Sequence, residues 1–569
     1  MNSLFLLLIA GIIFVFGYRF FAKLLSIWVF RLDPKYSTTT EVESDPEYGS
    51  SPTPVLFAQH VAALAAVSTV LGSAMAIIWG WVPAFLMVVV ASAVAGGTFG
   101  IGSLWISFRH QWHGPAHLSG VLFGPRVRNL LHLLFFSFLL ILSVIAVNLL
   151  ASLLSSYPTM VIPFWLQIPV ALILAMSLKT QSMKHILGSS IVAIVFIALS
   201  SWFFDHTTVA IGGTLDLNVA GRSWLPVNSH LIWAGGILIA IYFAVKLPMD
   251  KLMRPRGYLA GLQLGLLLLL FLAGLIVTHP TLTAPTIHYP EQGPDILPWI
   301  FISITGGALS GFHLLLASGQ TARQIRKESD AKLIGFGGAL IDALVALSAI
   351  IIFASGFPDL PAWNNFYQSW EHIQNLPVLL QGYINGVATL LTHLGLSAYT
   401  ARTLLAVIIG ALLLTALESG LRLQKQILGE LGENYGLAWL KDDKKTIGIL
   451  LALLALAVIA SRFLDQDNGF WPWFGLFNII VTGIGFLLIT TVLNGFHRAL
   501  GFTLIPFMLL LLIGNWALIE QSLLWWGQNR WVLFTGGVLL FIIEIWVIFE
   551  TFPVIRALTM KLMRPNRTD

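Results

Sequence analysis

Residues 301–347 read FISITGGALSGFHLLLASGQTARQIRKESDAKLIGFGGALIDALVAL, an apolar segment that would be expected to form a plain membrane helix. Four glycines interrupt it: Gly306, Gly307, Gly311 and Gly319. Glycine weakens a helix interior, and a broken helix persists in a bilayer only where its backbone groups are buried in protein or line a wet cavity. The segment predicts a helix that breaks inside the membrane, while close helix packing is the alternative use of these small residues.

The composition independently predicts a polytopic membrane protein. The 569 residues are 57% hydrophobic and 10% charged, whereas soluble domains are about 25% charged. The net charge of +5 fits basic cytoplasmic loops better than nucleic-acid binding, because no binding module lies outside the apolar segments. The chain has no cysteine, which excludes disulfides and thiolate metal sites and leaves the cellular compartment undecided.

Apolar windows of spanning length predict an all-α membrane protein with about 15 transmembrane helices. The windows fall at 1–31, 55–79, 82–107, 128–154, 160–178, 185–204, 230–248, 258–278, 296–318, 332–356, 400–421, 446–464, 473–496, 500–519 and 530–552.

Basic residues lie between alternate windows, which sets the expected orientation. In the first window Arg19, Lys23 and Arg31 follow the apolar core, the reverse of a signal peptide. The positive-inside rule then predicts an outer N-terminus and a cytoplasmic C-terminus. All basic loops are cytoplasmic together only if Leu379–Leu396 does not cross, so we expect this segment to be an interfacial helix on the outer face.

This topology predicts a LeuT-like core of two inverted five-helix units. The span at 55–79 would run outward and the broken span at 296–318 inward, so units that start there are inverted copies. Another inverted-repeat fold, such as a seven-plus-seven arrangement, is the alternative. The expected parts are an N-terminal helix at 1–31, a first unit at 55–204, two inserted helices at 230–278, a second unit at 296–496, and C-terminal helices with a basic tail at 500–569.

Several motifs resemble the carbon-starvation protein A (CstA) family. The family pattern of alanine-leucine-serine-glycine-phenylalanine-histidine, then serine-glycine-x-threonine, then glutamate-serine-aspartate appears as Ala308–His313, Ser318–Thr321 and Glu328–Asp330. The resemblance reaches to about Asn478 and indicates a divergent member. Other matching pieces are Gly17–Leu25, Arg31–Pro34, Pro52–Ala66, Arg254–Leu266, His279–Pro285, Glu418–Gln424 and Trp471–Asn478.

The resemblance implies a secondary active transporter of the bacterial inner (plasma) membrane. Its substrates would be peptides or amino acids, with pyruvate or another small monocarboxylate as the alternative, and its partner a coupling proton or other cation. It implies membrane lipid as the surroundings, and no cofactor, resident metal or nucleic acid; an oligomer is left open. A channel is a further alternative. An enzyme lacks support, because the chain has no HExxH, no GxSxG with partners and no P-loop.

The substrate site is expected where the two broken helices meet near the middle of the membrane. Free backbone groups at half-helix ends would attract a carboxylate there. The first break departs from the family, whose glycine-proline-x-valine-glycine-proline sequence is replaced here by Val67–Ser73, without proline. The expected substrate-binding residues are Ser68, Thr69 and Gly72 in the first helix, and Gly306, Gly307, Ser310, Gly311 and His313 in the second.

Ionisable residues within spans are costly and therefore indicate function. Asp342 has no charged neighbour within one helical turn, so we expect it to load and release a coupling proton. Glu418 has Arg422 at i+4, which predicts either an intrahelical ion pair or, together with Thr415 and Ser419, a coupling-cation site.

The histidines leave two interpretations open. His60 and His313 lie on the broken helices, where they would serve gating or a proton relay or simply be buried and hydrogen-bonded. His110, His113 and His117 are spaced for one helical face and hence for a metal, although loop histidines are commonly just solvated.

The sequence also departs from the family at acidic and polar positions. The family's glutamine-aspartate pair in the third span is Phe99-Gly100 here, and its asparagine-glutamine pair after tryptophan-proline is Asn478-Ile479. At least one acidic group of the family is therefore missing. Glu544 is an additional mid-span carboxylate, for which we expect a role in packing or assembly.

Overall fold

The computed structural model describes residues 2–36, 49–65, 67–110, 114–180, 182–209, 215–219, 222–227, 229–291, 293–306, 309–464 and 470–563. Within these ranges the apolar segments are helical, which confirms the predicted class. One antiparallel hairpin, β1 (Leu215–Val219) with β2 (Arg222–Val227), lies in the connection between two spans. This hairpin is not evident from the sequence, because two strands this short carry little periodic signal.

Helices in the first part of the chain follow the expected windows, with short π- or 3-10-helical stretches (η) inserted. They are α1 (Ser3–Phe16), η1 (Gly17–Phe21), α2 (Ala22–Leu24), η2 (Leu25–Val29), α4 (Thr53–Leu64), α5 (Val67–Ala76), η3 (Ile77–Trp79), α6 (Trp81–Val90), η4 (Ala91–Gly96), α7 (Gly97–Arg109), α8 (Pro115–Phe123), α9 (Pro125–Ser156), η5 (Pro158–Met160), α10 (Val161–Lys179), α11 (Met183–Phe203), α12 (Ser229–Lys246) and α13 (Met253–Thr278).

The second part begins with a divided helix and ends with two long apolar ones. Its helices are α14 (Ile296–Ile304), α15 (Gly311–Leu316), η6 (Ala317–Thr321), η7 (Ala322–Gln324), η8 (Glu328–Asp330), η9 (Lys332–Gly337), α16 (Gly338–Ser355), α17 (Leu360–Phe366), α18 (Trp370–Ile373), α19 (Leu376–Thr392), α20 (Ala398–Tyr435), η10 (Ala438–Lys441), α21 (Asp443–Leu464), α22 (Trp471–Gly495), α23 (Gly501–Gly527) and α24 (Trp531–Met563).

Local chemistry explains where the longest helix begins and ends. The Ser397 side chain accepts a hydrogen bond from the Thr400 amide and caps the start of α20. Gly436 ends the helix at φ 68°, a left-handed conformation that glycine adopts without a steric penalty. As a result α20 has 38 residues and runs well beyond the expected window of 400–421.

Thirteen helices in the described part of the chain are long and apolar enough to cross a membrane, or 14 if the bent pair formed by α4 and α5–η3 counts as one span. A further expected span, 296–318, is divided between α14 and α15. The total of 15 spans therefore stays a prediction. The segment expected to lie on the outer face forms α19, a helix of 17 residues that is shorter than the spanning helices.

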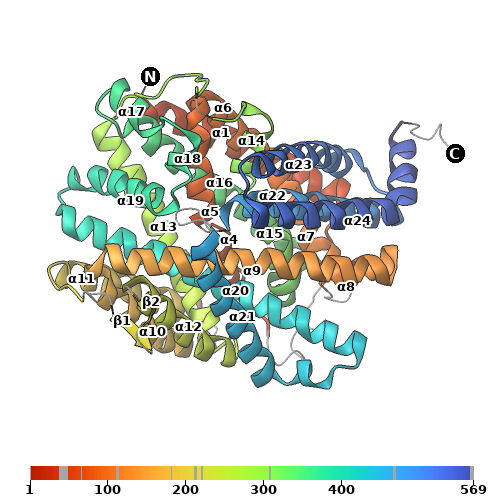
Figure 1. Ribbon diagram of the computed structural model, residues 1–569, viewed down its shortest axis with the longest axis horizontal. Helices are drawn as coiled ribbons and strands as arrows, with labels where there is room; N and C mark the ends of the chain where they lie inside the picture. Colours follow the sequence, from red (N-terminus) through yellow and green to blue (C-terminus); the bar gives the residue numbers. More distant parts are fainter. Residues whose placement is uncertain are drawn as a thin grey trace.

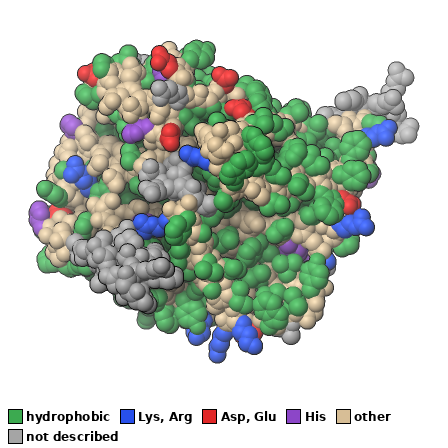
Figure 2. All heavy atoms as spheres, viewed as in Figure 1, with side chains coloured by type: hydrophobic (Ala, Val, Ile, Leu, Met, Phe, Trp, Pro, Cys, Tyr) green, Lys and Arg blue, Asp and Glu red, His purple; other side chains and the backbone are tan. Residues whose placement is uncertain are grey.

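The helices pack into one bundle around α9 and α20. In Figure 1, α9 crosses the width of the molecule, with α8 toward one end and the β1–β2 hairpin near the other. Figure 2 shows hydrophobic side chains covering the face formed by α23 and α24. Exposed residues of α24 include Leu539, Ile542 and Phe549, as expected for a helix whose solvent is lipid.

Candidate functional site

The first helix is broken although no proline lies at the break, but the break lies before Val67 and not within Val67–Ser73, which is helical. Helix α4 ends at Leu64, Ala65 leaves the helical conformation with ψ 47°, and α5 begins at Val67 with its axis bent by 48°. Gly72 lies one turn into α5 with its α-carbon against the backbone carbonyl of Ser303, so that any side chain at position 72 would collide with it. Close approach to the second broken helix therefore requires glycine at position 72.

The side chain of Asn478 on α22 forms hydrogen bonds with groups at the second break that would otherwise have no partner in the helix. Its Oδ1 accepts hydrogen bonds from Ser310 Oγ and from the Gly311 amide, both at 2.9 Å. Its Nδ2 donates to the Thr305 carbonyl at 2.5 Å. The carboxamide thus bridges the end of α14 and the start of α15 and satisfies backbone groups that a broken helix exposes in the membrane.

The two breaks meet directly. Ser68 Oγ donates a hydrogen bond to the Gly306 carbonyl at 2.9 Å, and the Gly72–Ser303 contact lies one turn away. Gly307, which we also expected here, lies outside the described residues. Ser310 Oγ and the Gly311 amide both donate to Asn478, and substrate binding by these two residues stays a prediction.

Asp342 lies beside this meeting point. Thr69 Oγ1 donates to Asp342 Oδ1 at 2.7 Å, and both side chains are buried. Within the described residues the second carboxyl oxygen, Oδ2, has no hydrogen-bond partner. A buried carboxyl group with one neutral donor and a free oxygen is suited to exchange a proton or to bind a ligand.

The two histidines of the broken helices lie close together. The His60 and His313 ring centroids are 5.2 Å apart, and His60 Nδ1 lies 2.9 Å from Thr321 Oγ1. Gly100, which stands where the family has aspartate, faces the His313 ring and the Gly335 backbone. In this chain that close approach leaves no room for a side chain at position 100.

Glu418 has two arginine partners, of which only Arg422 was expected from the sequence. Arg422 donates from Nε and Nη2 to Glu418 Oε1, at 3.2 and 3.0 Å, and Arg256 of α13 donates from Nη2 to Oε2. All three side chains are buried. Two guanidinium groups leave the cluster with a net positive charge, so the contacts favour the ion-pair interpretation over a coupling-cation site.

Thr415 and Ser419 do not join this cluster through their hydroxyl groups. Thr415 Oγ1 donates to the Ala411 carbonyl at 2.7 Å, and the Ser419 carbonyl accepts from Gln320 Nε2 at 2.9 Å. The second contact ties α20 to η6, the continuation of the second broken helix.

The Glu328–Asp330 motif ties several loops together at the end of the bundle that we expect to be cytoplasmic. Glu328 accepts two hydrogen bonds from Arg109 Nη2, at 2.8 and 3.0 Å, and one from the Asp33 amide at 3.1 Å. Burial, together with the charges of Arg31 and Arg109, lowers the pKa of the nearby Arg498. Glu328 therefore supplies negative charge that balances part of the positive charge of a cluster of arginines at this end of the bundle.

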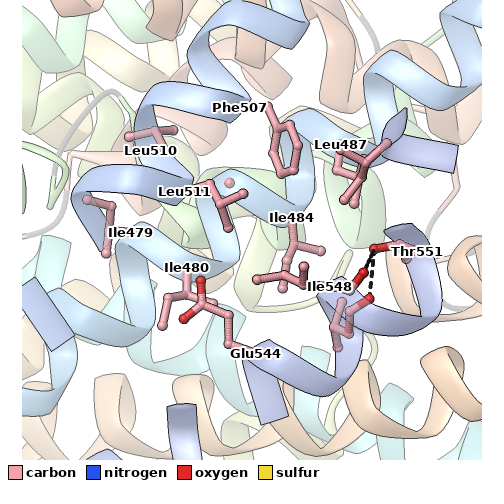
Figure 3. A pocket seen from close by; sticks show the side chains of 13 residues that line it. Ile479, Ile480, Ile484, Leu487, Phe507, Leu510, Leu511, Glu544, Ile548 and Thr551 are labelled. Carbon is pink, nitrogen blue, oxygen red and sulfur yellow. Dashed lines mark hydrogen bonds between the residues drawn. The ribbon is translucent and has the colours of Figure 1, made fainter. Parts of the chain in front are cut away.

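The remaining expected residues lie elsewhere. Glu544 lies in a pocket between α22, α23 and α24 (Figure 3), where its Oε1 accepts from Asn515 Nδ2 at 3.0 Å. His113 is outside the described residues. His110 and His117 belong to no group of three acidic or histidine side chains able to hold a metal, a statement limited to the part of the chain that the structure describes.

Interrupted helices that meet beside a buried carboxyl group, within a bundle of many membrane spans, define a class: membrane proteins built for transport. Comparison with known proteins assigns the family. The model of the family described as carbon starvation protein CstA matches residues 2–359, and the chain belongs to this family. This match confirms the resemblance in the sequence but ends well before Asn478.

Curated relatives are named as transporters. The peptide transporter CstA of Mycobacterium tuberculosis (strain ATCC 25618 / H37Rv) is 27% identical over 365 residues, which cover 62% of this chain and 46% of the relative. The peptide transporter CstA of Campylobacter jejuni is 25% identical, covering 93% and 82%. The pyruvate/proton symporter BtsT of Escherichia coli (strain K12) is 27% identical, covering 62% and 49%. These names support the expectation that the chain is not an enzyme.

The alignments with the Mycobacterium and Escherichia relatives thus span about half the length of those proteins. Among solved structures, a manganese transporter of Eremococcus coleocola is 13% identical, covers 90% of this chain and 99% of its own, and has a TM-score of 0.41. Agreement at this level does not establish a shared fold.

Proposed function

We propose that this protein is a secondary active transporter that takes up small carboxylate-bearing nutrients, foremost peptides or amino acids, together with protons. The observation that carries the proposal is the junction of the two interrupted helices, where Ser68 bonds to Gly306 and the neighbouring Thr69 bonds to the buried Asp342. The junction brings unwound backbone and an ionisable group together inside the membrane, as a coupled carrier requires.

The start of α5 is the better candidate to hold the substrate carboxylate. The first amides of a helix have no intrahelical acceptors, and the helix dipole favours an anion there. In the second helix, the Gly311 and Phe312 amides are already bonded to Asn478 and Ser310. The proposed substrate site therefore centres on Ser68, Thr69 and the Gly306 backbone.

Coupling is assigned to Asp342. A carboxyl group that exchanges its proton while the substrate is bound links proton movement to substrate movement. The reason is that the charge on Asp342 changes the affinity of the adjacent site for an anion. His60 and His313 lie on the same two helices and remain candidates to relay the proton.

The packing of the two broken helices supports the inverted-repeat architecture. Helix α5 of the first unit packs against α16 of the second, and α15 of the second packs against α7 of the first. Helices α9 and α20, each the third of its unit, pack along one another. Reciprocal contacts of this kind are what a pseudo-two-fold axis relating 55–204 to 296–496 requires. The fold, the unit boundaries, the inner-membrane location and an outer N-terminus stay proposals.

Uptake by the purified full-length protein in liposomes tests the function. Labelled dialanine, alanine and pyruvate are supplied at several concentrations, with and without an inward proton gradient. We expect saturable uptake of at least one of them that the gradient stimulates. A pyruvate-only profile would favour the alternative suggested by the Escherichia relative, and non-saturable uptake that ignores the gradient would indicate a channel.

A further inference from the structure

A pocket lies where the chain leaves α11 and meets the connection between α19 and α20. Its volume is about 540 Å³, within the range of about 300–1,000 Å³ that small-molecule sites occupy. None of its described lining residues takes part in the junction of the broken helices, so the pocket is a separate site. These residues are Trp202, Phe203, Asp205 and His206 around the end of α11, and Gly395, Leu396, Ser397 and Thr400 around the start of α20.

The expected topology places this pocket at the outer boundary of the membrane. Lys179 and Lys184 lie around the turn between α10 and α11, so the positive-inside rule puts the far end of α11 outside. Trp202, Phe203 and Tyr399 are exposed there by 62%, 69% and 60%, and aromatic residues are typical of the boundary between membrane and water. We therefore expect the pocket to be within reach of the outer solution and of lipid headgroups.

Asp205 provides a buried carboxyl group in this pocket. The residue is 6% exposed, and its Oδ2 accepts a hydrogen bond from Thr400 Oγ1 at 2.6 Å. Its Oδ1 lies 3.6 Å from His206 Nε2, which is too long for a hydrogen bond. Because a carboxylate accepts up to about four hydrogen bonds, Oδ1 can still accept one from a ligand.

The negative charge of Asp205 is only partly balanced within the pocket. His206 is the one basic residue among the described lining residues, and its side chain is 80% exposed, so water and salt screen its charge. A cation that enters the pocket is therefore attracted to Asp205, whereas an anion is repelled.

The bond between Thr400 and Asp205 also ties α20 to α11, which is its structural role. That role uses one carboxyl oxygen and requires no pocket beside the other. The lining residues Trp202 and Phe203 add a contact that favours cations, because the faces of aromatic rings attract positive charge. A primary ammonium group, which has one positive charge and three hydrogen-bond donors, matches both the carboxylate and the rings.

We propose that this pocket binds the primary ammonium group of a small external molecule or of a lipid headgroup, held by Asp205 and flanked by Trp202 and Phe203. An amino acid or peptide in the outer solution and an aminophospholipid carry the same group, so only the source differs. The inference goes beyond the proposed transport function and does not depend on it.

Two probes that share the ammonium group distinguish the sources. The purified full-length protein in detergent is titrated with ethanolamine, which is soluble and has no carboxylate for the helix junction, and with a short-chain phosphatidylethanolamine. Short-chain phosphatidylcholine, whose trimethylated nitrogen donates no hydrogen bond, is the comparison. We expect saturable binding of at least one ammonium probe, with the ethanolamine lipid bound more tightly than the choline lipid where a lipid is bound.

Asp205→Asn removes the charge but keeps an oxygen that accepts from Thr400, so the fold should be retained. Its affinity for the ammonium probe should fall about tenfold, which corresponds to about 1.4 kcal/mol. Trp202→Ala, at an exposed position, should also weaken binding and is the second variant if Asp205→Asn does not fold. Asp295→Asn is the matched control, because Asp295 is an exposed aspartate on the same expected face that does not line the pocket; it should bind as wild type does.

Binding of ethanolamine alone would identify a soluble amine as the source, and binding of phosphatidylethanolamine alone a lipid headgroup. The inference would be overturned if neither probe bound saturably or if Asp205→Asn left the binding unchanged. Equal binding of the two lipids without binding of ethanolamine would overturn it as well. A wild type that binds ethanolamine but transports nothing would uphold this site and refute the transport function.

Discussion

Thr69 and Asp342 are 273 positions apart in the sequence, yet Thr69 Oγ1 donates a 2.7 Å hydrogen bond to Asp342 Oδ1. The bond joins the first broken helix to α16, immediately beside the point where Ser68 reaches Gly306. A change in the protonation of Asp342 therefore alters a contact at the proposed substrate site, because the carboxylate accepts the hydrogen bond from Thr69 more strongly than the neutral acid does.

Asp342→Asn should separate substrate movement from proton movement. The amide keeps the shape of the side chain but cannot exchange a proton, so gradient-driven accumulation and its pH dependence should be lost while substrate exchange continues. Labelled-substrate counterflow measures the exchange. Asp342→Glu, which restores the carboxyl group, is the control and should recover part of the accumulation. Unchanged proton-driven accumulation in Asp342→Asn would refute this role.

Glu418→Gln should damage both stability and transport. The change leaves Arg256 and Arg422 buried beside each other without their shared carboxylate, and removing one partner of a buried ion pair costs about 3–5 kcal/mol. We expect a clear fall in the thermal unfolding temperature in detergent and loss of counterflow. Glu433→Gln, an exposed position of the same helix, should behave as wild type. Sodium-dependent uptake lost only in Glu418→Gln would instead point to a cation site.

Gly72→Leu should prevent the two broken helices from meeting. A side chain at this position collides with the Ser303 carbonyl, and backbone cannot move aside as a flexible side chain can. Uptake should fall at least about tenfold, as measured in liposomes at equal protein content. Gly265→Leu on α13, where an added β-carbon meets nothing within 4 Å, is the control. Full activity of Gly72→Leu would mean that the junction does not form part of the transport path.

Single cysteines test the topology of α19, since the chain has none of its own. Asn364 and Ser397 flank the segment and are exposed, whereas the neighbouring Trp363 is buried and would react poorly for that reason alone. Cysteines at both positions should react with an impermeant reagent from outside, and one at Lys445 should not. Labelling of Asn364→Cys and Ser397→Cys from opposite sides would show that the segment crosses the membrane.

The sequence was sufficient for the helical class, the family and the position of the second break, because hydropathy and interrupting glycines are local signals. It did not identify Asn478 or Arg256 as partners of the break and of Glu418. Both residues were visible within family-like motifs, but their partners lie 167 and 162 positions away, at Gly311 and Glu418 respectively. Contacts between distant helices depend on the bundle that forms, which periodicity does not specify.

The first break has no local helix breaker that would have predicted it. Val67–Ser73 contains no proline, yet the helix bends by 48° between Leu64 and Val67. The bend is stabilised by contacts with the other broken helix, such as the bond between Ser68 and Gly306, and not by a local helix breaker. Tertiary contacts outweighed local propensity here.

Proton movement driven by substrate alone is the sharpest test of coupling through Asp342. Liposomes that contain the protein and a trapped pH-sensitive dye, with no imposed gradient, receive substrate from outside. We expect acidification of the liposome interior in wild type, in proportion to substrate uptake, and none in Asp342→Asn even though that variant still exchanges substrate. Uptake by wild type without acidification, or equal acidification in wild type and Asp342→Asn, would contradict it.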